Sequence, residues 1–198
     1  TTSVQPGESD YRVMVPLANP ASEKQLITLG SVVADEHDGT VVAVNIVPVP
    51  DQTSLESARA QREYEAAHHL LDQAQADAET YAADVETHVV LSHQPFEEIF
   101  NAARRYGVDT CVMGWGEDSH AAPGRAEPTI DELAHDLPCD LLVFKDRGFD
   151  PSEVVVPTAG GPGSDLAAGV ARALQDKFHA NVRLLHIAED EAAGETFL

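Results

Sequence analysis

Short apolar runs alternate along the chain with longer segments that carry apolar residues at every third or fourth position. Five runs have the length and β-branched content of buried strands: 11–17, 40–47, 85–91, 108–113 and 141–144. Four segments between them have the spacing of amphipathic helices: 20–36, 58–83, 95–106 and 130–137. Strand and helix therefore alternate four times before a fifth strand, which predicts an α/β fold with a doubly wound, five-stranded parallel sheet.

Several residues mark where the predicted helices begin and end. Asn19 stands at the start of the first helix, Pro95 lies in the first turn of the third, and Gly107 stops it. Thr129, with Glu132 three residues on, forms a capping box for the last helix. The carboxyl ends of the strands, near the switch in strand order, are where a ligand is expected.

The pattern restarts beyond residue 151. The strand 153–159 contains Val156-Pro157, as the first strand contains Val15-Pro16, and a helix (166–178) and a strand (182–187) follow it. We therefore expect an internal repeat whose second copy is cut short. The expected organisation is a lead-in, a complete unit, a linker and a truncated strand-helix-strand copy: 1–10, 11–146, 147–151 and 152–198.

Charge narrows the class of partner. The 198 residues contain 34 acidic and 12 basic side chains, which gives a formal net charge of -22. A chain this acidic is repelled by nucleic-acid phosphates, so a nucleic-acid partner is excluded. Lys24, Lys145 and Lys177 are its only lysines, and the acids are spread along the chain. This pattern favours a protein adapted to very salty cytoplasm over an ordinary acidic protein or one with an acidic tail.

The remaining composition indicates a reduced, cytoplasmic chain. Cys111 and Cys139 are the only cysteines and have no metal-ligand spacing, so buried thiols are expected. No apolar run is long enough for a membrane span. The chain begins Thr1-Thr2-Ser3 without a methionine, so we expect a piece of a longer protein whose membrane part lies elsewhere.

Three segments carry a family resemblance. They are Arg12 to Pro16 in the first strand, Val112 to Gly116 in and after the fourth, and Ile130 to Val143, where a helix is followed by Pro-Cys-Asp and an apolar strand. With the helix of 99–109, they resemble the universal stress protein family over residues 10–146, with 151–188 as a partial second copy. The resemblance implies the Rossmann-like form of the sheet that adenine nucleotide alpha hydrolases share.

The resemblance also implies partners. Tandem copies of this kind occur as the cytosolic tail of cationic amino acid (APC-type) transporters in halophilic archaea. An attached membrane transporter domain, on the cytoplasmic side of the membrane, is therefore expected. Family members often pair through the fifth strand, either between two chains or between two copies in one chain. The corresponding edge here is formed by Leu141, Leu142, Val143 and Phe144.

Some family members bind ATP or AMP, which implies a ligand site at the ends of the strands. The positions that match it are Pro16, Leu17, Ala18, Asn19, Ile46, Met113, Gly114, Gly116 and Thr129. Ala18 stands where an acidic residue is expected, and Gly114-Trp115-Gly116 is one residue shorter than the family's glycine turn. Pro128-Thr129 replaces a Gly-Ser/Thr pair. These departures leave a smaller ligand, AMP or no nucleotide as alternatives.

Other polar features have two interpretations each. The loop with Gly160, Gly161, Gly163 and Ser164 forms either an anion nest at a helix N-terminus or a connector capped by Ser164 or Asp165. Thr129 is either a helix cap or a ligand residue. His68 and His69 lie on a helix without the partners of a metal site, so a solvated helix face is favoured. No catalytic residue and no metal ligand is assigned.

Three functions are therefore compared. The favoured one is a non-enzymatic regulatory and dimerising module that senses a small ligand or the salt state, as the cytosolic C-terminal part of an amino acid transporter. The second is an ATP- or AMP-binding protein with at most slow ATPase activity. The third, a catalytic relative acting through the loop at Gly160, lacks an assembled nucleophile, base or metal set.

Overall fold

The computed structural model describes residues 11–58, 62–81, 83–115, 130–158 and 162–186. The chain divides into two compact units that meet between Arg147 and Gly148. Because their relative placement is not defined, each unit is described by itself.

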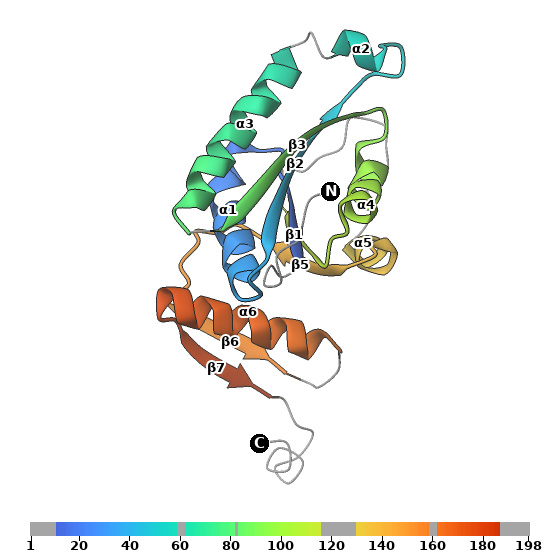
Figure 1. The fold of residues 1–198 in the computed structure, drawn as a ribbon. Helices are drawn as coiled ribbons and strands as arrows, with labels where there is room; N and C mark the ends of the chain where they lie inside the picture. Colours follow the sequence, from blue (N-terminus) through green and yellow to red (C-terminus); the bar gives the residue numbers. More distant parts are fainter. Residues whose placement is uncertain (1–10, 59–61, 82, 116–129, 159–161, 187–198) are drawn as a thin grey trace, which may run out of the picture. The chain divides into compact units, whose positions relative to one another are not determined.

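The first unit is built on a five-stranded parallel sheet with the strand order β3-β2-β1-β4-β5. The strands are β1 (Arg12–Pro16), β2 (Thr40–Pro48), β3 (Asp84–Ser92), β4 (Thr110–Gly114) and β5 (Asp140–Phe144). On one face lie α1 (Pro20–Asp35) and α3 (Arg62–Glu79), and on the other lie α4 (Pro95–Tyr106) and α5 (Ile130–Asp136) (Figure 1). The predicted doubly wound parallel sheet is confirmed.

Burial follows from the two-sided cover. The three central residues of β1 and the apolar centre of β2 have no exposed surface, as expected for strands covered on both faces. Met14 and Val42 pack with Ile99 of α4 and Leu133 of α5 in one core cluster. On the opposite face α1 approaches β1 so closely that a Cβ on Gly30 would lie 2.5 Å from Val15 Cγ2.

The helix that the sequence predicts over 58–83 has different boundaries in the structure. The single helix expected over 58–83 is replaced by a short α2 (Leu55–Ala58) and by α3, which ends at Glu79. Ser54 explains the first turn, because its Oγ accepts a hydrogen bond from Ser57 N at 3.2 Å. Tyr81, expected on the helix, lies beyond its end and receives a 3.2 Å hydrogen bond from Thr28 Oγ1.

The predicted stops and caps are mostly confirmed. Gly107 ends α4 with a φ of 61°, which is the left-handed conformation that glycine adopts without strain. Asn19 caps α1, because its side chain accepts a hydrogen bond from Ala21 N at 2.9 Å. The capping box at Thr129 and Glu132 is not tested, since Thr129 and the side chain of Glu132 lie outside the described residues.

The second unit contains the partial second copy that the sequence predicts. Strands β6 (Glu153–Pro157) and β7 (Asn181–Leu185) pair in parallel, and α6 (Pro162–Phe178) connects them. The helix begins four residues earlier than the expected Leu166, because Pro162 is well suited to a first helical turn.

The two copies match residue for residue at an offset of 141 positions. Arg12 pairs with Thr40 in the first copy, and Glu153 pairs with Asn181 in the second. The hydrogen bond from Leu17 N to Val44 O, 2.8 Å, recurs as that from Thr158 N to Leu185 O, 2.9 Å. Register and turn geometry are therefore repeated together with the sequence pattern.

Candidate functional site

The switch in strand order lies between β1 and β4. From β1 the chain passes through α1 to β2, and from β4 it passes through α5 to β5, so the two connections leave in opposite directions. In open parallel sheets the carboxyl edge at such a point is where ligands bind. The predicted site residues that follow β1 and end β4 therefore come to the same edge of the sheet.

The end of β1 is held by hydrogen bonds that the protein makes to itself. Leu17 is 2% exposed, and its N–H donates to Val44 O at 2.8 Å. Its carbonyl oxygen accepts a 2.8 Å hydrogen bond from the Nδ2 of Asn45. Both backbone groups of Leu17 are thus occupied, while Pro16 is half-buried and Ala18 is exposed.

Asn45 is a residue that the sequence analysis missed. It lies in β2, is 8% exposed and holds the turn between β1 and α1 through Leu17. The second copy repeats this contact, because His186 Nδ1 lies 2.7 Å from Thr158 O at the equivalent position. A polar residue within or at the end of an apolar strand, at the same offset in both copies, is the signal that could have identified the pair.

Asn19 and Ala18 offer little chemistry to a nucleotide. The Asn19 side chain is engaged in capping α1, and Ala18 supplies no carboxylate for a ribose or a base. The exposed residue Ala18 and the first turn of α1 are what this connection presents at the edge of the sheet.

The end of β4 is shaped by packing. A Cβ on Gly114 would lie 3.1 Å from Leu26 Cδ1, so this glycine permits the close approach of α1. Trp115 donates its N–H to Phe144 O at 2.8 Å and packs against the core cluster that contains Leu133. Trp115 is therefore a packing residue at the rim of this core.

Two further predicted site residues lie on the α4 and α5 side of the sheet. Ile46 is half-buried and packs against the core cluster, and Met113 is a 7% exposed member of it. Their side chains therefore contribute to the core. The sequence analysis expected them at a ligand site and did not anticipate this packing.

The glycine loops are only partly described. Gly116, Thr129, Gly160 and Gly161 lie outside the described residues. Gly163 is exposed and Ser164 is half-buried, and both lie in the first turn of α6 and not in the loop expected before it. The structure thus brings Pro16 to Asn19 and Gly114 to one edge, and it places Gly163 and Ser164 in the second unit.

A second missed residue is the buried Glu23 of α1. Its side chain has no exposed surface, although acids in a first helical turn usually face solvent. Burial, together with the negative charge of Asp77, raises the pKa of Glu23 from 4.5 to about 7, and Lys24 partly opposes the shift. An acidic residue at a helix start gives no sequence signal for such burial.

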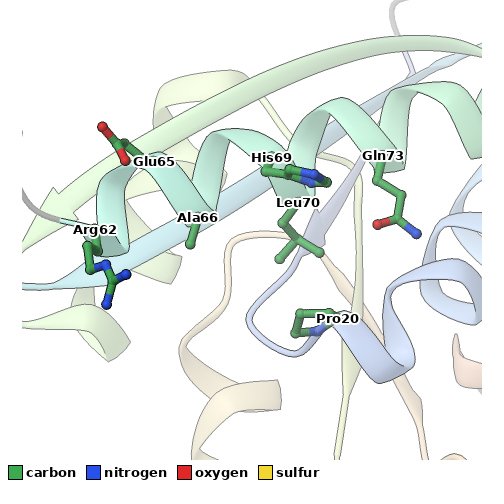
Figure 2. Close-up of a pocket in the computed structure, with 7 residues that line it drawn as sticks. All are labelled: Pro20, Arg62, Glu65, Ala66, His69, Leu70 and Gln73. Carbon is green, nitrogen blue, oxygen red and sulfur yellow. The ribbon is translucent and has the colours of Figure 1, made fainter.

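A hollow of about 580 Å³ lies between the start of α1 and α3. Figure 2 shows Leu70 reaching toward Pro20, with Arg62 and His69 on the same wall. Glu65, Ala66 and Gln73 complete the lining. The hollow adjoins the first turn of α1 and therefore lies beside the connection that follows β1.

Thiol and metal chemistry have little support in the described residues. Cys111 is fully buried in β4, and burial raises the pKa of its thiol well above the ordinary value. Burial likewise raises the pKa of Cys139 to about 11. Within 11–58, 62–81, 83–115, 130–158 and 162–186, no three His, Cys, Asp or Glu residues gather as metal ligands.

The outer edge of β5 is formed by Leu141, Leu142, Val143 and Phe144, all half-buried. One side of β5 pairs with β4. In the part of the chain that the structure describes, no strand pairs with the other side of β5. None of the helices in that part is long and apolar enough to cross a membrane.

One curated relative is a membrane transporter. The Na⁺/H⁺ antiporter NhaS5 of Synechocystis is 26% identical over 148 residues, which cover 73% of this chain and 20% of that protein. The chain thus spans about a fifth of the length of the relative that it matches.

Solved structures share the fold. The universal stress protein of Archaeoglobus fulgidus in complex with dAMP is 14% identical, with a TM-score of 0.52, and the match covers 68% of this chain and 98% of that one. A universal stress protein in complex with cAMP is also 14% identical with a TM-score of 0.52, covering 69% and 98% of the two chains. The family model for universal stress proteins matches residues 11–145. On the sheet order and on this match, the chain belongs to the universal stress protein family.

Proposed function

We propose that this chain is a non-enzymatic regulatory module that forms the cytosolic part of a membrane transporter. The observation that carries the proposal is the match to a fifth of the antiporter NhaS5, because a universal-stress-protein unit fused to a carrier has a regulatory role as its simplest use. The resemblance of the sequence points to an amino acid transporter of halophilic archaea, and the relative is an ion exchanger. The class common to both is a secondary transporter.

The candidate site supports sensing over catalysis. At the edge of β1 and β4 the polar side chains make hydrogen bonds within the protein: Asn19 caps α1, and Asn45 donates to the carbonyl oxygen of Leu17. No nucleophile with a neighbouring base is assembled among the described residues at this edge. A site of this kind acts by linkage, because a ligand that binds one packing of the module better shifts the attached carrier by that difference in affinity.

Self-association belongs to the same proposal. The edge of β5 supplies the apolar side chains of 141–144 for pairing with another chain or with a second copy. In the second unit, Val155, Leu184 and Leu185 are 57%, 67% and 49% exposed, whereas the equivalent residues of the first copy are buried. Apolar exposure of this extent favours a partner for that sheet as well.

The alternative function is ATP or AMP binding with at most slow ATPase activity. Its support is that neighbours with this fold bind dAMP and cAMP. Calorimetric titration of the chain with ATP, AMP and cAMP in multimolar KCl distinguishes the two functions. Submillimolar ATP binding that Gly114→Val abolishes would favour the alternative, provided that circular dichroism shows the variant folded.

The regulatory function is tested with the complete gene product in vesicles. Transport is measured against salt concentration for the native protein and for a version that lacks residues 11–186. We expect the truncated carrier to retain transport but to lose its salt or ligand response. An unchanged response would overturn the proposal.

A further inference from the structure

The contact between α1 and α3 buries a carboxyl group to which no described residue donates a hydrogen bond. Glu23 is 0% exposed, and neither of its carboxylate oxygens has a hydrogen-bond partner within the described parts of the chain. An ionised carboxylate in such a place is costly, because water is removed and no donor replaces it. A buried acid of this kind is stable mainly when it carries a proton.

The charged groups around Glu23 add to this cost. Asp77 of α3 is the neighbour that acts against its ionisation, and the adjacent Lys24 favours ionisation weakly. Strands β1, β2 and β4, which also pack against α1, contribute Arg12 and Cys111 as their titratable residues. Arg12 stands at the start of β1 and pairs with Glu86, and Cys111 belongs to the core cluster on the opposite face.

The position of Glu23 links it to the candidate site. Both α1 and α3 run away from the carboxyl edge of the sheet (Figure 1). The hollow between them is lined by Pro20 and Gln73, and Glu23 and Asp77 lie about one turn further along each helix. Asn19, which caps α1 and follows Ala18, is four residues before Glu23.

We propose that Glu23 is a proton-binding switch: its protonation holds the first turn of α1 against α3, and its ionisation loosens that turn beside the candidate ligand edge. When the proton leaves, two negative groups face each other across the helix contact, and the hollow lined by Pro20 lies about one helical turn away. The cap at Asn19 and the backbone of Ala18 then lose their fixed position. This inference goes beyond the proposed function and holds whether or not a transporter is attached.

The size of the effect follows from the two titrations. The pKa of Glu23 is about 7 in the packed state and 4.5 in an open, solvated one. The opening equilibrium of α1 should therefore rise by up to about tenfold per pH unit between these values and level off above them. Salt weakens the part of the pKa shift that comes from the charge of Asp77, but it does not screen the part that comes from removing the Glu23 carboxylate from water.

Hydrogen exchange on the full chain in multimolar KCl tests the switch. Amide exchange in peptides from 18–34 and 70–81 is followed from about pH 5 to about pH 8 for the native chain, Glu23→Gln and Glu65→Gln. Glu65→Gln removes an exposed acid from the same hollow and serves as the matched control. At each pH, the exchange rates of the native chain and of Glu65→Gln are divided by those of Glu23→Gln, which removes the intrinsic pH dependence of amide exchange. Both ratios should rise with pH, because both proteins keep Glu23. Ratios that stay constant with pH would overturn the proposal, because the three proteins would then open alike.

A carboxyl ¹³C titration of the native chain keeps the test valid if Glu23→Gln does not fold. We expect a midpoint near the value in the packed state, which moves down in Asp77→Asn because one opposing negative charge is removed. A midpoint at the ordinary value of a glutamate would overturn the inference, since the carboxyl group would then be solvated.

Discussion

Replacing Asn45 with leucine removes the hydrogen bond that holds the turn after β1. The Nδ2 of Asn45 lies 2.8 Å from Leu17 O, and the two residues are 8% and 2% exposed. Leucine has the same branched arrangement of four side-chain heavy atoms but no donor, so the change leaves a buried carbonyl group unsatisfied. We expect a loss of about 1–3 kcal/mol in the free energy of unfolding of the first unit.

The second copy provides a matched control for this change. His186 makes the equivalent contact with Thr158 O at 2.7 Å, but it is half-buried. In His186→Leu, water can reach the carbonyl group more easily, so we expect a cost below about 1 kcal/mol.

Urea unfolding followed by tryptophan fluorescence measures the free energy of unfolding of the first unit. The chain has a single tryptophan, Trp115, and it packs against the core of the first unit. With an m-value of about 2 kcal/mol/M, Asn45→Leu should lower the midpoint by about 1 M at an unchanged slope. A change within about 0.5 kcal/mol, or a larger loss in His186→Leu as seen by Trp115, would refute the role given to Asn45.

Three further changes probe the packing of α1. Gly30→Ala should destabilise by about 1–3 kcal/mol in urea unfolding, because the new Cβ meets Val15 Cγ2 at 2.5 Å; a neutral result would mean that α1 shifts freely. Ser31→Ala should raise the thermal midpoint, since the buried Ser31 Oγ has no hydrogen-bond partner among the residues that the structure describes, and a lowered midpoint would reveal a lost contact. Glu23→Gln should remove a pH dependence. The native state binds the Glu23 proton more tightly than the unfolded state does. As pH rises from 4.5 to about 7, the free energy of unfolding of the native chain should therefore fall by about 3 kcal/mol relative to that of Glu23→Gln. Parallel curves of unfolding free energy against pH for the two proteins would contradict this.

The fold could be predicted because its signals are local and repeated. Apolar runs bounded by turn residues identified all five strands of the first sheet, and Gly107 marked its helix end through a conformation that glycine alone adopts readily. The second copy was visible for the same reason, since Val156-Pro157 repeats Val15-Pro16. Local rules failed at α2, because this short helix, capped by Ser54, lies before the helix that the apolar spacing predicts over 58–83.

The candidate site was harder to predict because packing decides the role of its residues. Gly114 matched a phosphate-binding glycine in the sequence, yet the side chain of Leu26, far away along the chain, accounts for it. Ile46 and Met113 matched ligand positions but face the core cluster. An acid at a helix start usually faces solvent, so only the position of α3 reveals that Glu23 is buried.

The size and location of the native gene product test the proposed function most directly. Cells of the source organism are lysed in multimolar salt and separated into membrane and soluble fractions, and both are probed with an antibody against residues 11–145. We predict a band in the membrane fraction well above 21.2 kDa, as expected for a module joined to a carrier. A band confined to the soluble fraction at about the mass of this chain would contradict the proposal.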